Sequence, residues 1–207
     1  MSLPFEFREP IRTERLALRL MTVADVDDVH AYQGREDVCL YLLHEPRTRD
    51  EIERHVAKCA AATTLAADGD WIEPAIELDG RVIGHMYVNL SSVEHLGGEI
   101  GWTLHPDFFG QGYATEASRA ILDLAFGELG LHRMHAELDP RNDASIALCH
   151  RLGMREEAHF VKDMLVKGVW DDTGVYAVLA EEWAAGRLPE GPPPDAADPG
   201  ALGSVAP

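Results

Sequence analysis

Residues 105–117 read HPDFFGQGYATEA and place Gly110 and Gly112 directly ahead of a run with a helical pattern. Glycine reaches backbone conformations that are closed to other residues, and it has no side chain to block a neighbour. A strand, a glycine loop and a helix N-terminus form an arrangement in which free backbone N–H groups converge on a phosphate. The pattern predicts either an anion-binding loop or a tight turn without a ligand, and two glycines alone do not separate these.

The loop departs from two familiar nucleotide-binding patterns. The chain has no GxxxxGK[ST] run, which excludes a nucleotide triphosphatase loop. A dinucleotide-binding unit is the nearer alternative, because residues 99–139 have the order and length of a βαβ unit that ends near Glu137 and Asp139. However, Thr115 stands where the third glycine would be, and an antiparallel hairpin precedes the unit. These departures disfavour a dinucleotide site.

The cysteine and histidine patterns indicate neither a metal site nor a nucleophilic thiol. Cys39, Cys59 and Cys149 form no CxxC pair and are odd in number, so we expect reduced thiols. The ten histidines show no HExxH motif. Cys149 and His150 are neighbours on a predicted helix and do not face each other, which disfavours a covalent cysteine mechanism. We therefore expect no metal.

The elements that must position the loop alternate between helical and strand patterns. Thr48 followed by Glu51 predicts a capping box, and Asp79-Gly80 predicts a tight hairpin turn. The expected elements are a strand at 15–21, helices at 22–33 and 48–67, a hairpin at 71–90, a strand at 97–104, a helix at 115–129, a strand at 133–139, a helix at 142–152 that stops at Gly153, and two final runs around 158–166 and 175–183.

Composition limits the class of protein. The length of 207 residues suits one domain, predicted at 1–185, and the segment 186–207 is rich in proline and predicted to be a flexible tail. Eighteen basic against thirty-six acidic residues give a formal charge of -18, which disfavours nucleic acid and slightly favours a cationic substrate. The sequence shows no apolar run that could span a bilayer and no secretory signal pattern, so we expect no membrane partner and a cytoplasmic protein.

Three segments together resemble the GNAT acyltransferases, and within them the Rim-type branch that includes ribosomal-protein N-terminal acetyltransferases. These segments are TERLALR at 13–19, PDFFGQGYATEA at 106–117 and NDASIALCHRLGM at 142–154, in the family's order and spacing. The resemblance runs from about Arg12 to Trp183. It implies a single GNAT-type α/β domain with a mixed, mostly antiparallel twisted sheet of about seven strands and about four helices. The wider superfamily has Gln or Arg at the position of Phe109, whereas the Rim-type branch often has an aromatic residue there. Phe109 therefore favours the Rim-type branch.

The resemblance also implies where acetyl-CoA binds. The loop amides would hold the pyrophosphate, the backbone of one strand would bond the pantetheine arm, and Asn142 would reach the same arm in addition to its expected role as a helix N-cap. The implied cofactor-binding residues are Trp102, Thr103, Leu104, Phe109, Gly110, Gln111, Gly112, Tyr113, Ala114, Thr115, Asn142 and Ser145.

Two residues are predicted to handle protons. Glu99 lies on the strand that enters the loop, where the resemblance implies a general base, although an ordinary polar strand residue is the alternative. Many GNAT enzymes have a tyrosine acid seven residues after the asparagine, and here that position is Cys149, which we expect to be buried packing. The resemblance to Rim-type enzymes implies a serine acid three residues after the asparagine, in the first turn of the helix, so Ser145 is the candidate acid.

The sequence thus predicts an acetyl-CoA-dependent N-acetyltransferase in which an amine attacks directly in a ternary complex, as a monomer or homodimer. The acceptor stays open among a protein N-terminus, a polyamine, an aminoglycoside and a small metabolite. A regulatory module that binds acyl-CoA without turnover is the alternative, because the tyrosine is missing.

Overall fold

A computed structural model of the chain describes residues 3–186. The strands are β1 (Phe5–Glu6), β2 (Ile11–Arg12), β3 (Ala17–Arg19), β4 (Thr64–Leu65), β5 (Trp71–Ile72), β6 (Ala75–Leu78), β7 (Arg81–Ser92), β8 (Gly97–Leu104), β9 (Arg133–Leu138), β10 (Arg155–Val166) and β11 (Val169–Leu179). The α-helices are α1 (Val26–Gln33), α2 (Glu36–Cys39), α3 (Arg49–Ala61), α4 (Tyr113–Asp123), α5 (Asp143–Arg151) and α6 (Ala180–Ala184), and a π-helical turn (Leu124–Glu128) extends α4. The predicted mixed α/β class is confirmed.

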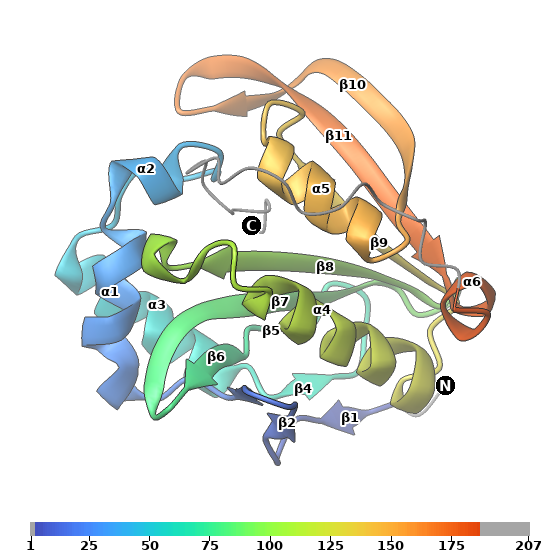
Figure 1. The fold of residues 1–207 in the computed structure, drawn as a ribbon, viewed down its shortest axis with the longest axis horizontal. Helices are drawn as coiled ribbons and strands as arrows, with labels where there is room; N and C mark the ends of the chain where they lie inside the picture. Colours follow the sequence, from blue (N-terminus) through green and yellow to red (C-terminus); the bar gives the residue numbers. More distant parts are fainter. Residues whose placement is uncertain (1–2, 187–207) are drawn as a thin grey trace.

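One large sheet forms the centre of the molecule (Figure 1). Its strands lie in the order β10-β11-β9-β8-β7-β6-β3-β2, with β5 paired to β7, while β1 and β4 form a separate pair. All of these pairings are antiparallel except β8 with β9. Within residues 3–186 there are more elements than the predicted seven strands and four helices, because strands of two residues and helices of four or five carry too little pattern to detect.

Helices cover both faces of the sheet. On one face, α1 and α3 bury an apolar cluster that includes Val29, Tyr32 and Val56. On the other, α4 and α5 pack against Ile100, Trp102 and Leu104 of β8, together with Ala117, Ile121, Leu148 and Cys149. Alternation along β8 therefore turns Glu99, Gly101 and Thr103 toward the face of α1 and α3.

Several local sequence patterns form the structures that they predict. The Thr48 hydroxyl accepts a hydrogen bond from the Glu51 amide, and the Glu51 carboxylate accepts one from the Thr48 amide, so the capping box begins α3. Asp79 and Gly80 have φ values of 50° and 81° between β6 and β7, as a tight hairpin turn requires. The predicted strand at 97–104 coincides with β8.

Two predicted helix boundaries were wrong. Helix α4 begins at Tyr113, two residues before the predicted start, because Gly112 takes a left-handed conformation and serves as its N-cap. Helix α3 ends at Ala61 and not at 67, because Thr64–Leu65 pair with Phe5–Glu6 as a strand. In both places the backbone follows tertiary contacts or glycine geometry that periodicity does not report.

The predicted tail at 186–207 lies outside the described residues except for its first residue, so its boundary stays a prediction. Between residues 3 and 186, the model contains no helix with the length and apolar character needed to cross a membrane.

Candidate active site

The glycine loop has an open surface. Gly110 and Gly112 have φ values of 71° and 82°, in the left-handed region that favours glycine. A Cβ atom at Gly110 would meet no atom within 4 Å, and one at Gly112 would meet only Arg15 Nη2 at 3.4 Å. The backbone conformation therefore requires the glycines, while packing against a neighbour does not. The open space above them leaves room for a ligand to approach the main chain.

The N-terminus of α4 adjoins this open surface. Gly112 is the N-cap and has no side chain to cap the helix. The N–H groups in the first turn of an α-helix have no carbonyl partner within the helix, and the helix dipole places partial positive charge there. Tyr113, Ala114 and Thr115 belong to this turn. Loop and helix together form a cradle suited to a phosphate.

The segment Thr13-Glu14-Arg15 holds the loop in place. Arg15 Nε donates to Glu116 Oε2 over 2.7 Å, and its Nη1 donates to the Gln111 carbonyl oxygen over 2.9 Å. The guanidinium lies over the Tyr113 ring at 4.4 Å, and the Thr13 hydroxyl donates to Glu116 Oε1 over 2.5 Å. Sequence reasoning included these residues in the family resemblance but gave them no role, because the partners are about a hundred positions apart.

Strands β8 and β9 separate beside the loop. Their parallel register covers Gly97–Glu99 against Arg133–His135, although β8 continues to Leu104 and β9 to Leu138. On its other edge β8 pairs with β7 along its whole length. The backbone of residues 100–104 thus has a strand neighbour on one side, and on the side of β9 the ladder ends.

Glu99 lies at this point of separation. Its cross-strand partners are Asn89 on β7 and His135 on β9. Burial and then the negative charge of Glu137 raise the pKa of Glu99 to about 7. The His135 Nδ1–H donates to the Gly98 carbonyl oxygen over 2.8 Å, and burial lowers the pKa of His135, so the ring is neutral near pH 7. Glu99 is therefore a carboxyl group that can exchange a proton near neutral pH.

Trp102, Asn142 and Ser145 meet on the opposite face of β8. The Trp102 Nε1–H donates to Ser145 Oγ over 3.2 Å, and Asn142 Oδ1 accepts from the Ser145 amide over 3.1 Å. Asn142 caps α5, as predicted, and all three side chains are buried. This contact brings the start of α5 against the middle of β8.

Cys149 is fully buried in α5, and burial raises the pKa of its thiol well above the usual range. Such a thiol stays protonated near neutral pH and makes a poor nucleophile. This agrees with the expectation that Cys149 is a packing residue.

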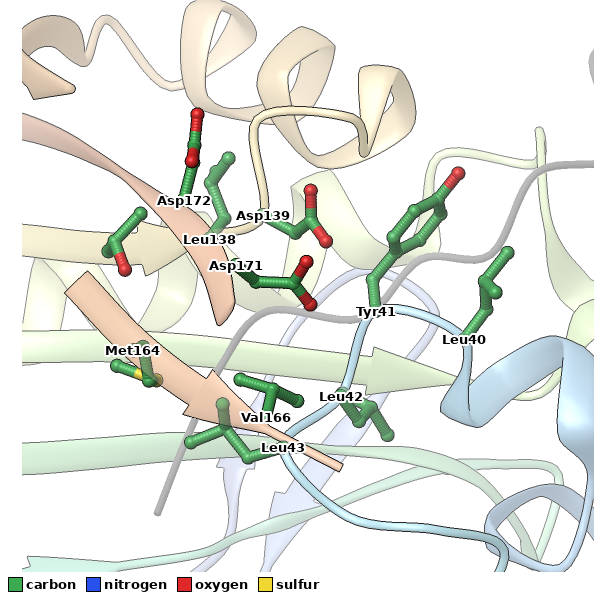
Figure 2. Close-up of a pocket in the computed structure, with 11 residues that line it drawn as sticks. Leu40, Tyr41, Leu42, Leu43, Leu138, Asp139, Met164, Val166, Asp171 and Asp172 are labelled. Atoms are coloured by element: carbon green, nitrogen blue, oxygen red, sulfur yellow. The ribbon is translucent and has the colours of Figure 1, made fainter. Parts of the chain in front are cut away.

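A pocket opens at the end of β9, where Leu138 and Asp139 follow Glu137 along the strand (Figure 2). Apolar side chains from the segment after α2 and from the β10–β11 hairpin line it, together with three aspartates. All three aspartates have partners: Arg141 pairs with Asp139 and with Asp171, and His159 lies 2.8 Å from Asp172. The lining residues are Leu40, Tyr41, Leu42, Leu43, Leu138, Asp139, Met164, Val166, Asp171, Asp172 and Thr173.

Comparison with known families decides what this arrangement belongs to. The family described as Acetyltransferase (GNAT) domain matches residues 15–155, which include β8, the glycine loop and α5. The chain belongs to the GNAT acetyltransferase family.

Relatives of this GNAT domain agree with the assignment. The N-acetyltransferase YnaD of Bacillus subtilis (strain 168) is 34% identical over 176 residues, which cover 84% of this chain and 98% of YnaD. A GNAT acetyltransferase from Bacillus anthracis has a structure with a TM-score of 0.75, 32% identity, and coverage of 84% of this chain and 99% of that one. The protein is an acetyl-CoA-dependent N-acetyltransferase.

The Rim-type branch appears among the structural neighbours. RimL, a ribosomal L7/L12 alpha-N-protein acetyltransferase solved with coenzyme A, has a TM-score of 0.70 at 19% identity and covers 83% of this chain and 98% of its own. The fold of this GNAT domain is thus also that of a Rim-type enzyme. The dinucleotide alternative is overturned, because β8 and β9 form the single parallel pair among the described strands of the large sheet.

The GNAT domain brings the sequence-predicted residues to one continuous region. Trp102, Thr103 and Leu104 lie on β8, residues 109–115 form the loop and the first turn of α4, and Ser145 contacts Trp102. Sequence reasoning gave Glu137 no part in proton handling, although its place on a strand beside that of Glu99 was visible in the pattern.

Proposed function

We propose that the protein transfers an acetyl group from acetyl-CoA to a primary amine by direct attack in a ternary complex, with Glu99 as the general base. The observation that carries this proposal is the position of Glu99. Its carboxyl group lies where β8 and β9 separate, and its pKa of about 7 suits proton transfer near neutral pH.

The residues present fit acetyl-CoA, which would supply the thioester acyl group. The loop from Phe109 to Thr115 would bind its pyrophosphate through main-chain N–H groups, since the space above Gly110 and Gly112 is open. The backbone of Trp102, Thr103 and Leu104 would bond the pantetheine arm in place of a strand neighbour. Asn142 would lie beside the same arm.

Proton handling would use one residue on each side of the reacting centre. A protein α-amine has a pKa of about 8 and a lysine-like amine about 10.4, so most acceptor molecules arrive protonated. Glu99 would take the proton from the amine, which then attacks the thioester carbonyl. The departing thiolate would receive a proton from the Ser145 hydroxyl, whose oxygen is held by the Trp102 N–H. Positioning of the two substrates next to each other would supply much of the rate enhancement.

The acceptor would enter through the pocket between residues 40–43 and the β10–β11 hairpin. The apolar lining would contact the body of the molecule, and its amine would point along β9 toward Glu137 and the neighbouring Glu99 on β8. Because each pocket aspartate already has a partner, the pocket favours an amine with an apolar body over a polycation. A protein N-terminus with an apolar first residue fits this description, and RimL, a structural neighbour, is named as an alpha-N-protein acetyltransferase.

Donor binding is tested by calorimetric titration of acetyl-CoA into the wild type and a Gly112→Trp variant. Gly69→Trp is the matched control, because Gly69 has φ 83° against 82° for Gly112, and a Cβ there meets no atom within 4 Å, where one at Gly112 meets only Arg15 Nη2 at 3.4 Å. We expect binding that Gly112→Trp abolishes and Gly69→Trp retains. Equal binding by all three proteins would remove the loop from the donor site.

Turnover is tested with a panel of peptides with apolar N-termini and of polyamines, measured by thiol release. We expect higher kcat/KM for the peptides. Binding of acetyl-CoA without acetylation of any amine would favour the alternative, a regulatory module that has lost turnover.

A further inference from the structure

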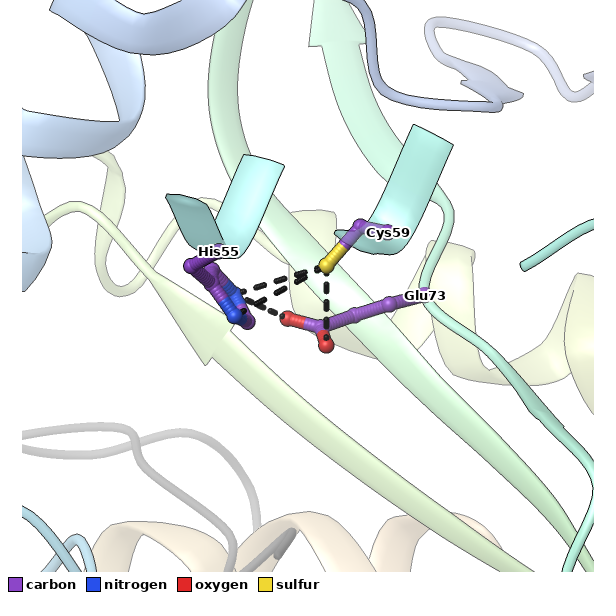
Figure 3. A group of neighbouring side chains, drawn as sticks. All are labelled: His55, Cys59 and Glu73. Atoms are coloured by element: carbon purple, nitrogen blue, oxygen red, sulfur yellow. Dashed lines mark hydrogen bonds and ion pairs between the residues drawn. The ribbon is translucent and has the colours of Figure 1, made fainter. Parts of the chain in front are cut away.

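A buried group of side chains that has no role in the proposed acetyl transfer lies between α3 and the sheet. His55 and Cys59 are one turn apart on α3, and Glu73 follows β5 in the segment that leads to β6 (Figure 3). Glu73 and Cys59 are buried, and the His55 side chain is 15% exposed. One potential ligand atom from each residue lies within 4.8 Å of the other two.

The distances within the group match those between ligands of one metal ion. A tetrahedral zinc ion with bonds of about 2.0–2.3 Å separates neighbouring ligand atoms by about 3.3–3.7 Å. Cys59 Sγ lies 3.6 Å from His55 Nε2 and 3.4 Å from Glu73 Oε2, and His55 Nε2 lies 3.0 Å from Glu73 Oε1. Residues four apart on a helix share one face, so His55 and Cys59 can serve the same ion.

His85 on β7 lies behind Glu73, outside the three-residue group, and helps to orient its carboxylate. Its Nε2 lies 3.1 Å from Glu73 Oε1, and its Nδ1 lies 2.8 Å from the Tyr32 hydroxyl. A partner that contacts a metal-binding side chain from outside the ligand set fixes the orientation of that side chain. Tyr32 is fully buried and holds His85 in this position.

The electrostatics of the group favour a cation. Among residues 3–186, the ion-pair partners of Glu73 are the imidazoles of His55 and His85. Neither partner is an arginine or lysine, so no permanent cation pairs with this buried carboxylate within the part of the chain that the structure describes. A divalent ion with one thiolate and one carboxylate would leave a neutral site, which removes the cost of an uncompensated buried charge.

We propose that His55, Cys59 and Glu73 bind one divalent transition-metal ion, with zinc as the best match and water as the fourth ligand, and that this ion fastens α3 to the sheet. Thiolate, imidazole and carboxylate are the ligands that zinc prefers in proteins. Binding breaks the Cys59 S–H bond and releases that proton to solvent, while the metal–sulfur bond forms. The site was not foreseen from the sequence, in which the cysteines form no CxxC pair and the three ligands come from two separate segments.

The test is a cobalt titration of chelator-treated full-length protein, followed by absorption. We expect saturation at about one equivalent, with the visible bands of tetrahedral cobalt and a near-ultraviolet sulfur-to-cobalt band. Cys59→Ser should lose the near-ultraviolet band. Cys149→Ser is the matched control, since Cys149 is also a fully buried helical cysteine, and it should keep the band. Zinc should compete with cobalt. It should raise the Tm of the wild type by about 5–10 °C when the free zinc concentration is about 100 times its Kd.

Two further measurements keep the proposal falsifiable if Cys59→Ser does not fold. His55→Ala should weaken metal binding about 100-fold or more, because it removes a ligand from the part-exposed side of the group. Zinc measured in the protein as purified should approach one ion per chain. Absence of stoichiometric binding by the wild type, or a sulfur band that survives in Cys59→Ser, would overturn the proposal and leave a hydrogen-bonded cluster.

Discussion

Glu73 is a buried and Glu99 a half-buried carboxyl group, and their pKa values move in opposite directions. Burial alone would raise both. For Glu73, burial is outweighed by His85, by the hydrogen bond from His55 and by that from the Cys59 thiol, and the pKa falls to about 2. For Glu99, burial is joined by the negative charge of Glu137, and the pKa rises to about 7.

The difference shows that the partners of a buried carboxyl group decide what it can do. Glu73 accepts hydrogen bonds from His55 and Cys59 and lies 3.1 Å from His85 Nε2, so it is a fixed negative charge suited to holding other groups. Glu99 has no ion-pair partner among residues 3–186 and faces a like charge, so it can take up and release a proton near pH 7. One is suited to structure and the other to chemistry.

The largest expected effect comes from removing the proton acceptor. Glu99→Gln should lower kcat by about 10²–10⁴-fold, because a general base contributes that much to proton transfer. It should also remove the rise in rate with pH through about pH 7 that the wild type shows as Glu99 loses its proton. The measurement is steady-state acetylation of the best amine from pH 5.5 to 8.5.

Glu94→Gln is the control for this variant, because Glu94 lies exposed in the turn between β7 and β8. It should keep the wild-type rate and pH profile. A Glu99→Gln enzyme with full kcat would mean that its raised pKa has no part in the reaction.

The next largest effect concerns Glu73. Glu73→Gln should lower the free energy of unfolding by about 2–4 kcal/mol, because an amide NH₂ group would face N–H and S–H donors that need acceptors. Urea unfolding measures this loss. Glu53→Gln, on the exposed side of α3, should change stability by less than about 0.5 kcal/mol. Equal losses would show that the donors around Glu73 contribute little.

Glu99 should also affect the free energy of unfolding. The pH dependence of this effect should have the opposite sign to that of a salt-bridged carboxylate. Its pKa is raised from 4.5 to about 7, so between these pH values the native state keeps a proton that the unfolded state has released. The free energy of unfolding therefore falls as pH rises through this window. At pH 8, Glu99→Gln should be more stable than the wild type by about 2 kcal/mol, and at pH 4.5 the difference should be smaller. A difference that does not change with pH would contradict the raised pKa.

The smallest expected effect tests what raises the pKa of Glu99. Glu137→Gln removes the like charge and should lower the pKa of Glu99. The acid limb of the pH–rate profile should move to lower pH by less than about one unit, since burial is the larger cause. An unmoved limb would show that burial alone sets the pKa.

The sequence predicted the part of the site that is local in the chain. Strand 97–104 has alternating residues and glycine at its start, and the loop and helix that follow are continuous with it, so their order was readable from pattern alone. The residues that hold the loop in place could not be predicted from the pattern, because Arg15 contacts Gln111 and Glu116 only after the chain has folded. The start of α4 was missed because left-handed glycine at the N-cap depends on a backbone angle.

The two glutamates illustrate the same limit. The position of Glu99 on its strand was predicted, but its pKa depends on Glu137, which a parallel neighbouring strand brings close. Glu73 lies in a stretch of mixed character, and its partners come from α3 and β7, so nothing local marks it. The burial of a carboxyl group and the charges around it depend on the tertiary fold, so a local sequence pattern does not reveal them.

The separation of β8 and β9 has a consequence for the life of the protein in a cell. Their ladder closes over three residue pairs and then ends. With the donor's arm bound in that opening as proposed, the native state gains stability in proportion to the logarithm of donor concentration. When acetyl-CoA is scarce, that stabilisation would be lost, and the chain would unfold and meet proteases more often. The rate at which the protein is degraded would then depend on the supply of the metabolite that it consumes.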